Sequence, residues 1–136
     1  MIPFVIGAIM LFKAANGQTV QDKQTLAPAS QSVEQFVREY YADEPILADI
    51  ARCESQFRQY DENGVVLRGV VISADIGIMQ INERFHLDAA ETLGYDIKTI
   101  EGNLSYAKYL YEKDGTKPWN ASKKCWQKSQ KLAVKK

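Results

Sequence analysis

The sequence predicts an α+β domain that is mostly α-helical, with one small antiparallel β-hairpin region after the second helix. Apolar residues recur at helical spacing in several segments, and this spacing is lost between residues 59 and 73. The length of 136 residues suits one compact domain with a single core. Hydrophobic residues make up 46% of the chain and charged residues 25%, which excludes a collagen-like or fully disordered protein.

Two helices are expected before the β region. Ser32 and Gln35 have the spacing of a capping box, and apolar residues follow at helical intervals, which predicts a helix over residues 32–42. Pro45 suits the first turn of a second helix that runs to about Phe57.

The β region itself is expected to be a hairpin. Asn63-Gly64 is a strong turn signal, and the β-branched segments 65–67 and 70–72 have the composition of short strands. Further helices are expected at about 87–93, 101–113 and 120–129.

The N-terminal residues 1–17 are expected to be a signal peptide or an N-terminal anchor. Met1 to Phe12 form an apolar run with the length of a secretory h-region, which predicts export to the periplasm, the cell envelope or the extracellular space. Since no Lys or Arg precedes this run, an uncleaved anchor close to the membrane is the alternative. The polar segment 18–31 is expected to be a linker, followed by the folded domain, 32–129, and a basic tail, 130–136.

The charge of the chain argues against nucleic acid as a partner. Seventeen Lys and Arg balance seventeen Asp and Glu, so the formal net charge is zero. One histidine, His86, and two cysteines are too few for an ordinary zinc site, and no metal is expected. From Thr116 to Lys136 the chain has seven lysines and no carboxylate. This segment is either a solvated tail or a surface that attracts an anionic polymer.

Glu54 is the first candidate for chemistry. On a helical wheel it shares the apolar stripe of Leu47, Ile50 and Phe57, whereas Asp49, Arg52, Gln56 and Gln59 point to the other side. An apolar site raises the pKa of a carboxyl, and a protonated Glu near pH 6 to 7 can give a proton to a leaving group. The alternative is that Glu54 lies at the rim of the stripe and pairs with an arginine or a lysine.

Four segments in order resemble motifs of the lytic transglycosylase and lysozyme-like superfamily. Glu54-Ser55-x-Phe57 resembles its glutamate motif, and Gly77-Ile78-Met79-Gln80-Ile81-Asn82 resembles its G-[ILM]-M-Q-I-N motif. Asn103-Leu104-x-x-Ala107-x-x-Leu110-Tyr111 and Gly115-x-x-Pro118-Trp119-Asn120-Ala121 look like its closing helix and the segment that follows. The resemblance covers about Ile46 to Trp126.

This resemblance implies a lysozyme-like fold with the glutamate at a helix end, facing a cleft that binds amino-sugars. Glu54 is then the acid that protonates the glycosidic oxygen of peptidoglycan and afterwards the base, without metal or organic cofactor. In lytic transglycosylases the nucleophile is the 6-hydroxyl of the substrate, whereas in lysozymes it is water. The protein is expected to act as a monomer on peptidoglycan glycan strands.

Asp75 is the second candidate catalytic residue. Ser73-Ala74-Asp75-Ile76-Gly77 resembles the stretch where c-type lysozymes carry a second acidic residue, so Asp75 could face Glu54 across the cleft. The alternative is that Asp75 only caps the turn before the glycine.

The substrate-binding residues follow from the same motifs. Gln80 and Asn82 alternate with Met79 and Ile81, so the two amides can face the cleft while the apolar pair packs inward. Trp119 resembles the c-type lysozyme tryptophan that makes the glutamate pocket apolar, and the family tyrosine is absent there. The full set of candidates is Ser55, Met79, Gln80, Asn82, Tyr109, Trp119 and Asn120.

Cys53 and Cys125 are expected to form a disulfide in an exported protein, and a similar link joins the corresponding regions of c-type lysozymes. Closing a loop of about 72 residues would stabilise the fold by roughly 4 kcal/mol. Two buried free thiols are the alternative.

These observations predict an exported lytic transglycosylase that cleaves the bond between N-acetylmuramic acid and N-acetylglucosamine. One alternative is a hydrolytic lysozyme that uses Glu54 and Asp75. An alternative of another class is a module that binds glycan, or docks to an envelope assembly, without turnover.

Overall fold

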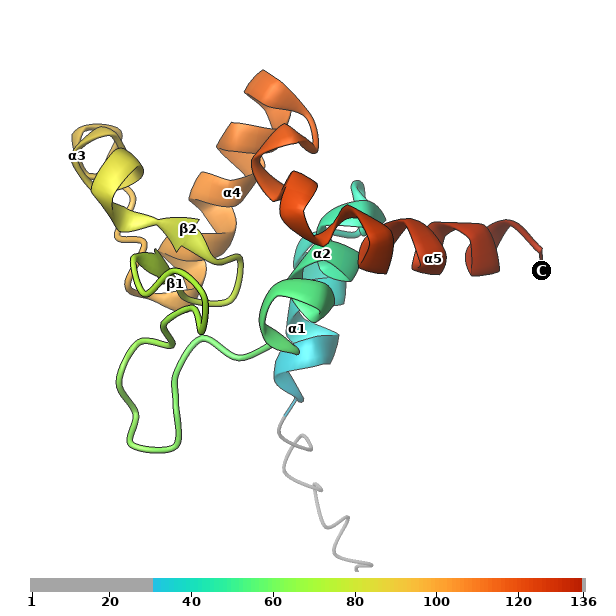
Figure 1. Cartoon of the computed structure of the whole chain (residues 1–136), viewed down its shortest axis with the longest axis horizontal. Coiled ribbons are helices and arrows are strands. Elements are labelled where there is room, and N and C mark those ends of the chain that lie inside the picture. The colour runs from blue at the N-terminus through green and yellow to red at the C-terminus, as the bar shows by residue number, and fades with distance from the viewer. Residues whose placement is uncertain (1–30, 136) are drawn as a thin grey trace, which may run out of the picture.

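Figure 1 shows the computed structural model of the chain, which describes residues 31–135. The expected signal peptide or anchor and all but the last residue of the expected linker lie outside the described residues. In chain order the elements are α1 (Val33–Tyr40), α2 (Pro45–Ser55), β1 (Asp75–Ile76), β2 (Ile81–Asn82), α3 (Glu83–Thr92), α4 (Ile100–Asp114), the 3-10 helix η1 (Lys117–Ser122) and α5 (Lys123–Val134).

The described part of the chain is mostly helical with one two-stranded antiparallel sheet after the second helix, as the sequence predicts, but the sheet is formed by β1 and β2 and not by the predicted segments. Figure 1 shows β1, β2 and α3 on one side of the molecule and α1, α2 and α5 on the other, with α4 between them. Among residues 31–135, none of the helices combines the length and the apolar character needed to cross a membrane.

The first two helices begin where the sequence predicts. The Ser32 hydroxyl accepts a hydrogen bond from the backbone N–H of Gln35 at 3.1 Å, and Pro45 is the first residue of α2. However, α2 ends at Ser55 because Gln56 and Phe57 adopt left-handed backbone conformations, with φ of 55° and 60°. This turn sends Phe57 into the core.

Gln59 is buried, so its predicted position opposite the apolar stripe of the second helix is wrong. The helical wheel does not apply to it, because the chain has already left the helix.

The strands predicted at 65–67 and 70–72 are not formed. In the first segment only Val66 makes an isolated bridge, with Tyr60, and the sheet lies further along the chain. Val70 and Val71 are 103% and 95% exposed. β-branched residues favour a strand where one face can be buried, and this segment has no such face. The predicted turn at Asn63-Gly64 is present, with Gly64 at φ 76°.

The later helices have different limits from those predicted. α3 begins at Glu83 rather than near 87, because the Asn82 side chain caps it by accepting a hydrogen bond from the Arg84 N–H at 3.1 Å. The helix predicted at about 120–129 is divided between η1, which has a kink at Trp119 with φ of −111°, and α5, which begins at Lys123. α5 then continues to Val134, through most of the segment expected to be a tail.

Tryptophans and a disulfide attach the C-terminal elements to the core. The Trp126 indole N–H donates to the carbonyl of Trp119 at 3.1 Å, and both rings are buried. The predicted disulfide between Cys53 and Cys125 is present and joins α2 to the first turn of α5. The core that these elements close contains, among others, Val37, Tyr41, Leu47, Ile50, Ile76, Ile78, Met79, Leu104 and Leu110.

Two buried amides hold the turn between β1 and β2. The Ile78 N–H donates to Gln59 Oε1 at 2.8 Å, and the Met79 N–H donates to Asn103 Oδ1 at 2.9 Å. Asn103 Nδ2 donates to the carbonyl of Ile76 at 3.1 Å. Since buried polar groups are costly unless they are paired, these bonds fix the turn relative to α4.

Gly77→Ala should cost more stability than Gly64→Ala, although both glycines have positive φ, 73° and 76°. A Cβ at Gly77 would lie 2.4 Å from Asn103 Nδ2 and 2.7 Å from Gln59 Oε1, whereas a Cβ at Gly64 meets nothing within 4 Å. Urea denaturation should show a loss of about 1 to 2 kcal/mol for Gly64→Ala and about 3 kcal/mol or more for Gly77→Ala. Equal losses would contradict this account of the turn.

Candidate functional site

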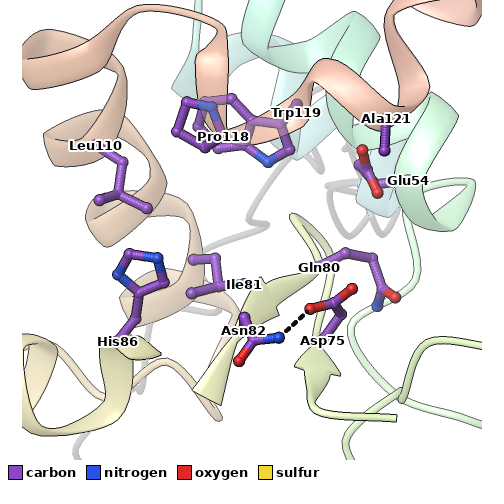
Figure 2. A pocket seen from close by; sticks show the side chains of 10 residues that line it. All are labelled: Glu54, Asp75, Gln80, Ile81, Asn82, His86, Leu110, Pro118, Trp119 and Ala121. Atoms are coloured by element: carbon purple, nitrogen blue, oxygen red, sulfur yellow. Dashed lines mark hydrogen bonds between the residues drawn. The ribbon is translucent and has the colours of Figure 1, made fainter. Parts of the chain in front are cut away.

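Glu54 and Asp75 line the same cavity, which has a volume of about 150 Å³. Figure 2 shows Glu54 beside Ala121 on one wall and Asp75 beside Asn82 on the other, with Gln80 between the two carboxyl groups. The remaining lining residues are Ile81, His86, Leu110, Pro118 and Trp119. Two carboxyls on opposite walls of a partly apolar cavity are an arrangement suited to acid and base chemistry.

Glu54 lies in the last turn of α2 and is only partly exposed. Burial raises the pKa of its carboxyl above the ordinary value, and the negative charge of Asp75 raises it further. The hydrogen bond from Ser122 acts in the opposite direction, because a donor favours the ionised carboxylate. Glu54 therefore keeps its proton to higher pH than a solvated glutamate does.

Ser122, the last residue of η1, orients the Glu54 carboxyl. Its hydroxyl donates to Glu54 Oε1 at 2.6 Å and is also 3.2 Å from the carbonyl of Trp119. A hydroxyl has one proton, so it can donate to only one of these acceptors at a time. With Oε1 taken by Ser122, Oε2 is the oxygen that can hold a proton for a ligand in the cavity.

The wall opposite Glu54 is polar. Asp75 Oδ1 accepts a hydrogen bond from Asn82 Nδ2 at 2.8 Å, directly across the β1–β2 pair. Gln80 Nε2 donates to the carbonyl of Gly77 at 2.8 Å, which braces the turn, and the side chain lines the cavity (Figure 2). Gln80 and Asn82 line the cavity and Met79 is fully buried, as predicted, but Ile81, which was expected to pack inward with Met79, also lines the cavity.

Trp119 gives the cavity its apolar wall. Its indole N–H donates to the carbonyl of Met79 at 2.9 Å, which ties η1 to the turn after β1, and only 3% of the residue is exposed. Pro118, Leu110 and Ala121 extend this wall. A partly apolar lining is in keeping with the desolvation that raises the pKa of Glu54.

Four predicted binding residues lie away from the cavity. The Ser55 hydroxyl is buried and donates to the carbonyl of Ile78 at 2.8 Å, and the Met79 side chain is in the core. Tyr109 stacks on Tyr106 and lines a separate cavity. Asn120 is exposed on η1 and is not part of the lining.

His86 lines the cavity from α3. Its Nδ1 is 3.0 Å from the Tyr106 hydroxyl, and burial, aided by the charge of Lys113, lowers the pKa of the imidazole. A neutral ring with Nδ1 engaged leaves Nε2 to meet a ligand (Figure 2).

Sequence reasoning missed Ser122 altogether. The residue directly follows Trp119-Asn120-Ala121, which did carry a signal, but its contact with Glu54 joins positions 68 residues apart. Within residues 31–135 there is no group of three or more His, Cys, Asp and Glu side chains placed to hold a metal ion.

Comparisons with family models, curated proteins and solved structures find no match to this chain.

Glu54→Gln should make the protein more stable near pH 7 but not near pH 3. The folded state raises the pKa of Glu54, so it binds the proton more tightly than the unfolded chain and loses stability as rising pH ionises the carboxyl. A glutamine at position 54 does not ionise and can still accept the Ser122 hydrogen bond. Thermal unfolding of the variant and the wild-type protein at a series of pH values measures the difference.

Glu83→Gln is the matched control, with the opposite sign. A hydrogen bond from Arg68 lowers the pKa of Glu83, so ionisation of this carboxyl stabilises the fold at neutral pH, and the variant should have a lower Tm there. If Glu54→Gln also lowered Tm near neutral pH, the raised pKa of Glu54 would be refuted.

Proposed function

We propose that this protein is a peptidoglycan lytic transglycosylase, a muramidase that cleaves the bond between N-acetylmuramic acid and N-acetylglucosamine. The observation that supports this most strongly is the partly buried Glu54 carboxyl, with its raised pKa, in a cavity that also holds Asp75, Gln80 and Asn82. On this proposal the helical domain with its two-stranded sheet is a lysozyme-like fold, and the protein is exported. The Cys53–Cys125 disulfide is in keeping with an oxidising compartment.

Glu54 has both roles in the proposed reaction. Its protonated carboxyl gives the proton to the glycosidic oxygen as the bond from that oxygen to C1 of the muramic residue breaks. The resulting carboxylate then takes the proton of the 6-hydroxyl, whose oxygen attacks C1 and forms the 1,6-anhydro ring. The acid is thereby regenerated without water or cofactor.

Ser122 assists the reaction at the stage when Glu54 is ionised. When Glu54 becomes a carboxylate, the Ser122 hydroxyl can donate to Oε1 and stabilise the new charge. When Glu54 is protonated again, the same hydroxyl can turn to the carbonyl of Trp119. The Ser122 hydroxyl can thus change its acceptor as Glu54 gains or loses its proton, while the serine side chain stays in place.

The polar wall suits an N-acetylated sugar. The side-chain amides of Gln80 and Asn82 both donate and accept hydrogen bonds, as N-acetyl and hydroxyl groups require. On the apolar wall of the cavity, the indole of Trp119 keeps water away from Glu54.

A hydrolytic lysozyme is the second candidate, because Asp75 lines the cavity opposite Glu54 and its charge acts on the pKa of Glu54. In that reaction Asp75 would stabilise the positively charged sugar or attack it, and water would complete the cleavage.

Glu54→Gln should abolish the cleavage of purified peptidoglycan, with a rate loss of about 1,000-fold or more, because an amide has no proton to give. Binding to the glycan should change little. Mass analysis of the released sugar ends tests the product, and anhydro-muramic ends are expected. Reducing ends would indicate a lysozyme, and a wild-type protein that binds without releasing products would indicate a glycan-binding module.

Asp75→Asn separates the two enzyme candidates. For a transglycosylase we expect anhydro ends and a rate within about tenfold of the wild type, whereas loss of the second carboxylate of a lysozyme should cost about 100-fold or more. Removing the charge of Asp75 should also lower the pKa of Glu54. The activity, which requires protonated Glu54, should therefore fall at lower pH than in the wild type. An unshifted pH profile would contradict this coupling.

A further inference from the structure

One face of α5 is a row of lysines. Lys124, Lys128, Lys131 and Lys135 follow one another at i, i+4, i+7 and i+11, so they lie along one side of the helix and its C-cap. The row is about 16 Å long at 1.5 Å per residue. All four residues are exposed, and together they are called the lysine face below.

The opposite side of α5 is fixed against the protein. Trp126 is buried, Gln130 Nε2 donates to Asp49 Oδ2 at 2.8 Å, and the Ser129 hydroxyl contacts the Arg52 guanidinium. The disulfide at Cys125 adds a covalent link to α2. The helix therefore cannot rotate about its axis, and the lysine face points outward, on an element that Figure 1 shows projecting from the body.

Among residues 31–135, no carboxylate forms an ion pair with the lysine face. The segment from Thr116 to Lys136 has no Asp or Glu, although the whole chain has equal numbers of acidic and basic residues. Within residues 31–135 the ion pairs shorter than 4.0 Å involve no lysine of α5. Like charges at i, i+4 destabilise a helix, and an external anion would relieve that repulsion.

A groove of about 550 Å³ beside the lysine face is also cationic. Its charged lining residues are Arg38, Arg52 and Lys128, with Asp49 as the one acid, and Asp49 is already shared by Arg38 and Gln130. Arg52 is partly buried and has no carboxylate within 4.0 Å among the described residues. The planar guanidinium of arginine suits a carboxylate ligand.

We propose that the lysine face and this groove hold the protein on peptidoglycan by binding the carboxylates of its peptide stems. This inference rests on the proposed function, because peptidoglycan is the proposed substrate. The cavity would bind its glycan strand, and the lysine face would bind its peptide stems. Stems recur along the glycan as separate anionic groups on flexible chains. A row of ammonium groups suits them because a lysine imposes little orientation on its partner.

An anionic bilayer fits the same helix less well. A helix that lies in a membrane surface buries an apolar face opposite or beside its lysines. In α5 that side packs on the protein through Trp126, and only Leu132 and Val134 are large exposed apolar residues.

The experiment measures binding of the full chain to purified sacculi, with Glu54→Gln present throughout to prevent cleavage. The test variant is K124Q/K128Q/K131Q/K135Q, since glutamine keeps the helix propensity of lysine. The control, R58Q/R84Q/K98Q/K108Q, removes the same charge elsewhere. We expect about tenfold weaker binding for the test variant at low salt, little change for the control, and convergence near 0.5 M salt. Circular dichroism checks that both variants keep their helices.

Treated sacculi and vesicles identify the anion. Amidation of the stem carboxylates should abolish the difference between the test variant and the control, whereas removal of phosphodiester-linked polymers should leave it intact. The proposal is overturned if the two variants bind alike, if removing the phosphodiester polymers abolishes the difference, or if the difference appears only on phosphatidylglycerol vesicles. The binding assay needs no turnover. The role of the lysine face and the transglycosylase activity are therefore tested separately, and either can be refuted without the other.

Discussion

The candidate site depends on how two buried amides hold one turn. Gln59 and Asn103 come from segments 44 residues apart, and together they bind the backbone of Ile78 and Met79. Because the turn is fixed from both sides, β1 and β2 leave it in a defined direction, and their side chains reach the cavity wall that faces α2. Space for these amides exists only because Gly77 has no side chain. The polar wall of the site thus depends on the buried hydrogen bonds that hold the turn behind it.

The other wall shows a conflict between stability and chemistry. The Glu54 carboxyl lies beside Ala121 in a partly apolar cavity and loses hydration, and the fold tolerates this because Ser122 satisfies one of its oxygens. An apolar residue at position 54 would avoid the cost of desolvation. A carboxyl that remains there, at the end of a helix and open to a cavity on one side, has the properties expected of an acid rather than of a structural residue.

The sequence predicted those features that depend on local chemistry. The starts of α1 and α2 follow from Ser32 and Pro45, and the placement of Gln80 and Asn82 follows from their alternation with buried neighbours. Features that depend on distant contacts were not predictable. Segment 70–72 has the composition of a strand but no partner to cover it, and Gln59 is buried because α2 ends early. Ser122 meets Glu54 because η1 packs against α2, a contact between distant parts of the chain. Resemblance supplied Asp75 and Trp119 but equally pointed to Ser55 and Asn120, which lie away from the cavity.

The disulfide lies one residue before Glu54 in the chain and three residues after Ser122. The first turn of α5 therefore cannot detach from α2 by itself, so a local opening that exposes the carboxyl must disrupt the end of the second helix as well. Amide protons around Cys53 and Trp126 should consequently exchange with solvent as one cooperative unit. Ser129 and Gln130 make the last hydrogen bonds between α5 and α2, so an opening of the helix end beyond them leaves the cavity of Glu54 and Asp75 intact.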